Sequence, residues 1–193
     1  MRNLIVTEFI SLDGVIESPM WTFPYWNDEI AAFKGEESEA SDALLLGRVT
    51  YDGFAQAWPE RGDEDGGAFF NNVRKYVVSN TLENAEWNNS VILRDIEEVR
   101  KLKEEDGRDI YVHGSGNLIQ TLLRENLVDR IRLLVYPVVL GKGQRLFEEG
   151  LTKTMRLVET KSFSSGVTAL IYEPVNANET AGAAASTDAV SQA

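Results

Sequence analysis

The chain contains no cysteine and only one histidine, His113, among its 193 residues. The absence of cysteine excludes disulfides, thiol nucleophiles and cysteine-rich zinc sites. A Ser-His-Asp triad would have to use His113, and no serine lies in the pattern of a nucleophile elbow. If the protein is an enzyme, we therefore expect its chemistry to come from an organic cofactor, with no metal centre.

Basic residues and long apolar runs are also scarce. Nineteen Lys and Arg face 31 Asp and Glu, which gives a net charge of −12 and disfavours nucleic acids and anionic membranes as partners. An anionic ligand in one locally basic pocket stays compatible with this balance. No apolar stretch approaches the roughly 20 residues that span a bilayer. The first residues run directly into a strand pattern rather than a signal peptide, so we expect a cytoplasmic protein.

Apolar runs and turn residues divide the chain into short alternating segments. The length favours one domain over residues 1–174, although two small ones would also fit. After Pro174 the composition shifts to Ala, Ser and Thr, which predicts a disordered tail over 175–193. The predicted strands are 3–10, 43–46, 75–79, 91–93, 109–113, 130–139, 155–163 and 167–173, and the predicted helices are 27–41, 48–57, 95–103 and 117–126. This order predicts an α/β fold with a mixed, mostly parallel sheet and an antiparallel edge.

Two glycine turns, about 65 positions apart, lie where a predicted strand hands over to a helix. The first is Gly47-Arg48-Val49-Thr50 and the second is Gly114-Ser115-Gly116-Asn117. A helix start exposes backbone N–H groups and partial positive charge, so both turns suit phosphate. Arg48 and Thr50 add a guanidinium and a hydroxyl. Each turn alone is also compatible with an ordinary helix start; the pair points to a nucleotide with several phosphates.

Further candidates lie at the ends of the first and third strands and at the start of the first helix. Ser79 and Asn80 end a strand where open α/β sheets bind ligands, although turn chemistry explains them equally well. Asp13 ends the first strand in an Asp-Gly turn and is a candidate for orienting a substrate.

An aromatic loop over residues 19–26 precedes the first helix. Trp21 and Phe23 in this loop are candidates for covering a flat ring that Glu29 would bind or protonate. Packing and a solvated helix start are the simpler explanations for these three residues.

These motifs, in this order, resemble the dihydrofolate reductase superfamily over residues 2 to about 173. The resemblance rests on the cofactor turns at Leu44–Tyr51, Val78-Ser79-Asn80 and His113–Gly116, and on the active-site loop Trp21-Thr22-Phe23-Pro24. Other motifs resemble its riboflavin-biosynthesis branch, the C-terminal reductase domain of the bifunctional deaminase–reductase. They are Ser11–Gly14, Leu127–Pro137, Leu140-Gly141-x-Gly143 and Leu146-Phe147.

The resemblance implies a dihydrofolate reductase-like fold with helices on both faces of the sheet, and an NADPH-dependent reductase acting on a small molecule. It implies that Gly47, Arg48, Thr50, Ser79, Asn80 and Gly114 to Asn117 hold the cofactor. Glu29 and Asp13 would be catalytic, Trp21 and Phe23 would contact the substrate, and the chain would form a homodimer. A dihydrofolate reductase proper is an alternative, which the lack of a matching arginine for the folate tail disfavours. A non-catalytic dinucleotide-binding module is another.

Overall fold

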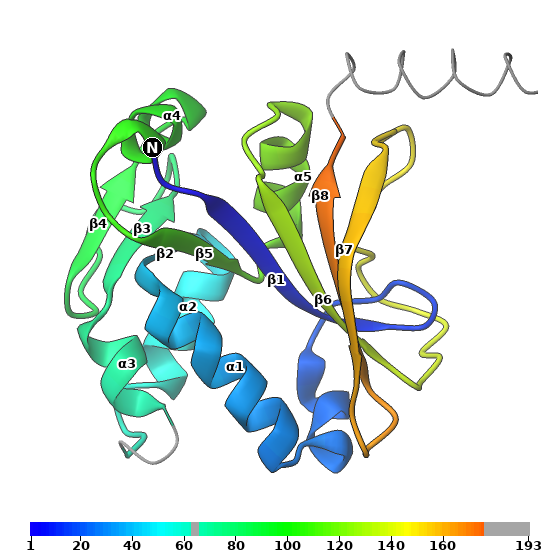
Figure 1. The fold of residues 1–193 in the computed structure, drawn as a ribbon. Coiled ribbons are helices and arrows are strands. Elements are labelled where there is room, and N and C mark those ends of the chain that lie inside the picture. Colours follow the sequence, from blue (N-terminus) through cyan, green and yellow to red (C-terminus); the bar gives the residue numbers. More distant parts are fainter. Residues whose placement is uncertain (63–65, 176–193) are drawn as a thin grey trace, which may run out of the picture.

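The computed structural model describes residues 1–62 and 66–175, and these form one eight-stranded sheet with helices on both faces (Figure 1). The strand order is β4-β3-β2-β5-β1-β6-β8-β7. The strands are β1 (Leu4–Ser11), β2 (Ser41–Gly47), β3 (Arg74–Val78), β4 (Ser90–Leu93), β5 (Asp109–His113), β6 (Arg130–Tyr136), β7 (Met155–Ser162) and β8 (Thr168–Pro174). The six strands from β4 to β6 pair in parallel, and β8 and β7 pair antiparallel. This confirms the predicted mixed sheet.

The central strands are apolar on both faces because helices cover both. The helices are α1 (Asp28–Ala40), α2 (Arg48–Ala57), α3 (Gly67–Asn72), α4 (Ile96–Glu104) and α5 (Gly116–Arg124). Leu4 and Val6 of β1 pack with α4 and α5, whereas Ile5 between them packs with α2. The same alternation runs through β2 and β5, as expected for parallel strands buried on two sides. In Figure 1, α1, α2 and α3 lie below the sheet, and α4 and α5 lie above it.

Two helices begin at their predicted starts, and each has a capping side chain there. The Asn27 side chain accepts a hydrogen bond from the Ile30 amide, and the Asp95 side chain accepts one from Glu98. Each cap satisfies an amide that the helix itself leaves unpaired. The starts of α1 and α4 are therefore confirmed.

Other boundaries differ from the prediction for local reasons. The strand predicted over 130–139 ends at Tyr136, since Pro137 has no N–H to continue a ladder. The helix predicted over 117–126 begins at Gly116 and ends at Arg124, before Asn126 adopts a positive φ of 54°. Helix α3 was not predicted, because six residues are too few for a clear periodic pattern.

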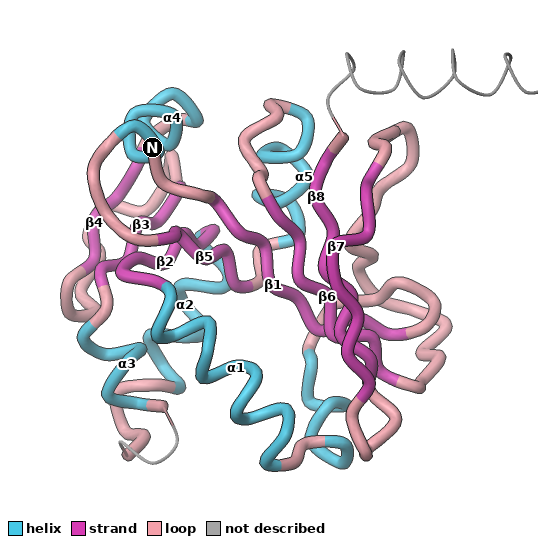
Figure 2. Tube along the Cα trace, viewed as in Figure 1, coloured by secondary structure: helices cyan, strands magenta, loops and turns pink. Residues whose placement is uncertain are grey.

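The aromatic loop and the tail are the remaining predicted segments. The aromatic segment predicted as a loop forms a 3₁₀ helix, η1 (Pro19–Tyr25). The Ser164-Ser165-Gly166 turn joins β7 to β8. The predicted disordered tail, residues 175–193, lies outside the described residues except for Val175, whose amide donates to the Thr154 carbonyl. Figure 2 shows the helices on both sides of the strand layer.

Candidate functional site

The two glycine turns meet at the carboxyl edge of the parallel sheet. Strands β2 and β5 are neighbours, and the connection after β2 leads through α2 to β3 on one side. The connection after β5 leads through α5 to β6 on the other side. Open α/β sheets bind ligands at such a reversal, because the two departing helices leave a crevice between them.

Ser115 joins the two turns directly. The Gly47 amide donates to the Ser115 hydroxyl at 2.7 Å, and that hydroxyl donates to the Thr50 hydroxyl at 2.8 Å. Ser115 holds a left-handed backbone conformation with φ 70°, which is uncommon for residues other than glycine. Three residues predicted to share one ligand therefore lie in hydrogen-bonding contact.

The helices that begin at these turns have no side-chain cap. Gly47, which has no side chain, precedes α2, and Ser115, whose side chain does not bond to the first turn of its own helix, precedes α5. Helices α1 and α4, in contrast, are capped by Asn27 and Asp95. Unsatisfied N–H groups and two positive dipole ends thus collect at one place, as an anion site requires.

Glycine is needed in both turns because a side chain at Gly47 or Gly114 would crowd a side chain of the other turn. A Cβ on Gly47 would lie 2.8 Å from the Ser115 side chain, and one on Gly114 would lie 3.1 Å from Thr50. Gly114 also has a φ of 66°, which glycine adopts without a steric cost. The two turns therefore pack closely against each other, and the two helix starts that they carry suit an anion.

Gly116 and Asn117 face a covering loop. A Cβ on Gly116 would lie 2.7 Å from the Gln144 amide and 2.9 Å from Ile16. The Gln144 amide also donates to the Asn117 side chain at 2.8 Å. These two residues therefore hold the loop around Gln144 against the start of α5.

Arg48, Ser79 and Asn80 form a neighbouring corner at the end of β3. The Arg48 guanidinium is about half exposed; it donates to the Thr81 hydroxyl at 2.6 Å and pairs with Asp52 at 3.4 Å. The Ser79 hydroxyl accepts from the Thr81 and Leu82 amides, so it shapes the turn itself. Asn80 is exposed beside it.

Arg94 stabilises this corner and was not among the predicted site residues. Its guanidinium donates to the Ser79 and Leu82 carbonyls at 2.9 and 2.8 Å. Its position directly after β4 is the one signal in the sequence, since neighbouring parallel strands end at the same edge.

Asp13 fastens the turn after β1 to the segment after β6. Its carboxylate accepts from the Ser11 hydroxyl at 2.7 Å and from the Leu140 and Gly141 amides at 3.1 and 2.8 Å. These hydrogen bonds, with Ser11 contributing most, lower the pKa of Asp13 to about 2. Asp13 is therefore ionised at neutral pH and suits orientation of a ligand rather than proton donation.

Glu29 is held by the turn between β7 and β8. Its carboxylate accepts from the Ser164 hydroxyl and from the Ser164 amide, the latter at 2.8 Å. Those bonds lower the pKa of Glu29, although the side chain is exposed. Asn27 adds a longer contact at 3.3 Å. Glu29 thus lies near the antiparallel end of the sheet as an ionised group.

Trp21 and Phe23 have different environments within η1. Trp21 packs edge-on against buried Tyr136 with 5.5 Å between ring centroids, and its indole donates to the Glu17 carbonyl. Phe23 is 58% exposed. Trp21 therefore anchors the segment, whereas Phe23 and Met20, which is 66% exposed, are available on its surface.

Two titratable residues near the glycine turns were not predicted as site residues. His113 ends β5 among the rings of Phe54, Phe70 and Tyr111, and burial lowers its pKa to about 3. Glu8 lies within β1, and burial raises its pKa to about 8. Its signal in the sequence was an acid inside an otherwise apolar strand.

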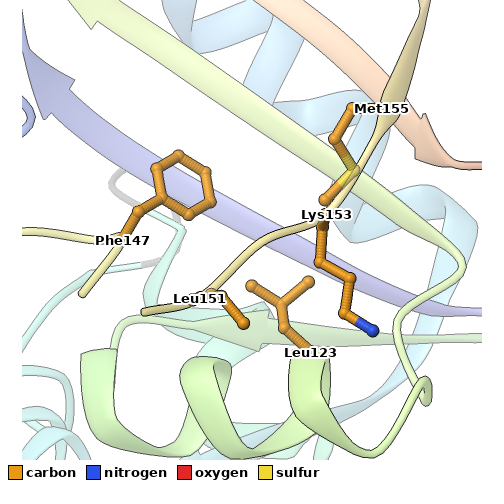
Figure 3. A pocket seen from close by; sticks show the side chains of 5 residues that line it. All are labelled: Leu123, Phe147, Leu151, Lys153 and Met155. Atoms are coloured by element: carbon orange, nitrogen blue, oxygen red, sulfur yellow. The ribbon is translucent and has the colours of Figure 1, made fainter. Parts of the chain in front are cut away.

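A cavity of about 220 Å³ lies at the other end of α5 (Figure 3). Its walls are Leu123, Phe147, Leu151, Lys153 and Met155. The Lys153 ammonium donates to the Asn126 side chain at 2.6 Å. None of the predicted site residues lines this cavity, so it is separate from the glycine turns.

Family comparison decides between the branches of the superfamily. The model of the RibD C-terminal domain matches residues 2–169. The chain belongs to the RibD C-terminal domain family. Membership makes it an oxidoreductase-type domain of the riboflavin-biosynthesis branch, which confirms the resemblance seen in the sequence.

Relatives of similar length support this membership. Protein YyaP of Bacillus subtilis is 33% identical over 178 residues, covering 89% of this chain and 94% of YyaP. YwjB of the same organism is 27% identical over 176 residues, covering 86% and 95%.

Solved structures share the RibD-type fold. A putative riboflavin biosynthesis protein from Shewanella sp. PV-4 superposes with a TM-score of 0.68 and 21% identity, covering 90% of this chain and 99% of that one. A pyrimidine reductase-like protein from Corynebacterium diphtheriae gives 0.65 and 13%, covering 91% and 92%. The bifunctional deaminase/reductase of Thermotoga maritima gives 0.65 and 18%, and the chain spans 57% of its length. These likenesses confirm the predicted fold class.

Proposed function

We propose that this protein is an NADPH-dependent reductase of the riboflavin-biosynthesis type, similar to a 5-amino-6-(5-phosphoribosylamino)uracil reductase. It would transfer hydride to a small heterocyclic or ribosylamine-type substrate. The observation that carries the proposal is the pair of uncapped helix starts, α2 and α5, that Ser115 joins at the strand reversal. Two such starts suit the two phosphates of a dinucleotide.

In this proposal the turns bind the cofactor along the carboxyl edge of the sheet. The amides after Gly47 and the Gly114-Ser115-Gly116-Asn117 turn hold the pyrophosphate, and the Thr50 hydroxyl adds a donor. Arg48, with Ser79 and Asn80 beside it, meets the adenosine side, where its guanidinium suits the 2′-phosphate that distinguishes NADPH. NADPH supplies a hydride when bound.

The remaining predicted residues orient and cover the substrate. Asp13 and Glu29 are both ionised, so each would accept hydrogen bonds from substrate N–H or O–H groups. Trp21 fixes η1, and Phe23 would close over the substrate and exclude water. Position and desolvation are the chain's contribution to the rate.

Calorimetric titration with NADPH tests the cofactor assignment. We expect Arg48→Ala to weaken binding by roughly 10- to 100-fold, since a charged hydrogen bond to phosphate is worth about 1.5–3 kcal/mol. Arg74→Ala is the matched control, because Arg74 is exposed at the opposite end of β3 and should leave the affinity unchanged. Failure of the wild-type protein to bind either NADPH or NADH would refute the proposal.

A turnover screen separates the alternatives. NADPH oxidation is followed with a ribosylaminouracil phosphate and with dihydrofolate. Turnover of the first supports the riboflavin-type reductase, whereas turnover of the second alone supports a dihydrofolate reductase proper. Tight NADPH binding without turnover across a broad panel of such substrates supports a binding module.

Assembly and location are further parts of the proposal. The exposed β7 edge supports a homodimer through the late strands. No helix in the described part of the chain is long and apolar enough to cross a membrane. The cytoplasmic location stays a prediction.

A further inference from the structure

Glu8 is a buried acid with one carboxyl oxygen, Oε1, that lacks a hydrogen-bond partner within the described residues. It lies in β1 between Thr7 and Phe9 and is 7% exposed. Its Oε1 atom is fully buried and has no partner among residues 1–62 and 66–175. An unpaired buried polar atom destabilises a fold. Its presence at this point indicates either a ligand that pairs with it or a loss of stability that function requires.

Glu8 lies in one row with the two glycine turns. Leu45 of β2 pairs with Val112 of β5, and Thr7 of β1 pairs with His113. Continuing these registers places Gly47, Gly114 and Glu8 side by side across three adjacent strands. Neighbouring strands are about 4.8 Å apart, so the Glu8 backbone lies one strand from the turn proposed to hold the pyrophosphate.

The surroundings of the Glu8 carboxyl disfavour its charged form. Burial raises its pKa to about 8, and the charge of Lys34 on α1 and the Gly114 amide oppose this only in part. On its own side of the sheet, α5 presents the apolar Leu118, Ile119 and Leu122. Thr7, His113 and Arg132 occupy matching register positions and belong to the opposite face, toward α1.

A protonated carboxyl group offers one donor and one acceptor side by side. A primary carboxamide presents the complementary pair, and the two groups can form two parallel hydrogen bonds. A dinucleotide whose phosphates lie over Gly47 and Gly114 carries its nicotinamide carboxamide within reach of the next strand. Both polar requirements of the Glu8 side chain would then be met.

We propose that Glu8 binds the carboxamide of the nicotinamide at the point where β1 extends past the end of β5. This inference rests on the proposed function and adds a ligand-binding residue to it.

The test compares Glu8→Gln and Glu8→Leu with the wild-type protein by calorimetric titration at pH 7 and pH 9. The probes are NADPH and 2′-phospho-ADP-ribose, which has the same phosphates but no nicotinamide. The 2′-phosphate titrates near pH 6, so its charge changes little over this range. Thermal unfolding of each apo protein serves as the stability readout.

For NADPH, we expect wild-type affinity to fall about tenfold from pH 7 to pH 9, as Glu8 ionises. Glu8→Gln keeps a donor and an acceptor, so its affinity should stay within about threefold of wild type at pH 7 and should not fall at pH 9. Glu8→Leu should bind about tenfold more weakly at pH 7 yet melt at an equal or higher temperature. Binding of the fragment should be the same in all three proteins.

The outcomes separate this inference from the proposed function. If the fragment binds but NADPH affinity is indifferent to Glu8 and to pH, the role of Glu8 is wrong and the proposed function stands. If Glu8→Leu lowers the melting temperature without changing NADPH affinity, Glu8 is structural and the inference is wrong. If neither probe binds the wild-type protein, both proposals fail.

Discussion

Ser115 connects two segments that are far apart in the chain. Its hydroxyl accepts from the Gly47 amide and donates to the Thr50 hydroxyl, so it sets the spacing between the starts of α2 and α5. It does so from a left-handed backbone conformation. Glycine would adopt that conformation at a lower steric cost, but it has no hydroxyl. The presence of serine there indicates that its hydrogen bonds are needed.

Replacing Ser115 by Ala and by Gly separates backbone strain from the hydroxyl. Ser115→Ala loses both hydrogen bonds and keeps the strained φ, so we expect about 1–2 kcal/mol of destabilisation. Ser115→Gly loses the same bonds but gains about 1 kcal/mol from the relaxed backbone. Urea unfolding measures the difference between the two variants.

NADPH titration of the same two variants measures the effect of each substitution on cofactor binding. Both should bind several-fold more weakly than wild type, since both lose the hydroxyl that joins the two turns. Unchanged affinity in both variants would show that the contact between the turns has no part in binding.

At the scale of the element, α1 is fixed to the sheet by one buried ionic cluster. Glu37 is 2% exposed and accepts from Thr7 at 3.0 Å and from Arg132 at 2.9 Å, and it also pairs with Lys34. Burial pushes the pKa of Glu37 up, but Lys34 and the other cations outweigh it, so the pKa is lowered. An ionised Glu37 therefore joins α1 to β1 and β6.

Glu37→Ala should destabilise the protein by roughly 3–5 kcal/mol, because two cations then lose their buried partner. Glu36→Ala is the matched control. Its exposed side chain only approaches Arg132, at 4.0 Å, and its effect should stay within about 0.5 kcal/mol. Equal losses in the two variants, measured by urea unfolding, would contradict a buried cluster.

At the scale of the whole molecule, the edge of the sheet formed by β7 is exposed to solvent. The parallel end is covered by helices, whereas β7 is exposed along nearly its whole length. Leu157 and Val158 there are 49% and 47% exposed. An exposed edge strand with apolar side chains is a template for pairing, and a chain with a net charge of −12 needs a specific contact to overcome its own repulsion.

We expect sedimentation analysis to give a mass twice the 21.6 kDa of one chain. Val158→Lys should shift the protein toward monomers, because it places a charge in the contact. Thr152→Lys adds the same charge at an exposed position outside β7 and should leave the dimer intact. A wild-type monomer at high concentration would exclude the dimer.

Residues with local partners were predictable from sequence, and those with distant partners were not. Asn27 and Asp95 cap the helices that follow them, so three residues of sequence are enough to recognise each. Asp13, in contrast, bonds to Gly141, 128 positions away, and Glu29 bonds to Ser164, 135 positions away. Their partners depend on how the strands assemble, and no local pattern records that.

The sequence by itself determined the order of the eight strands and of α1, α2, α4 and α5, the two glycine turns and the family. These depend on periodicity, turn chemistry and motif spacing, which neighbouring residues carry. Only the tertiary structure decided that β5 lies between β2 and β1. That placement brings Gly47, Gly114 and Glu8 into one row and leaves a buried acid beside the turns. The physical reason is that strand order depends on burying both faces of the sheet at once. The sequence of a single segment does not determine how this is achieved.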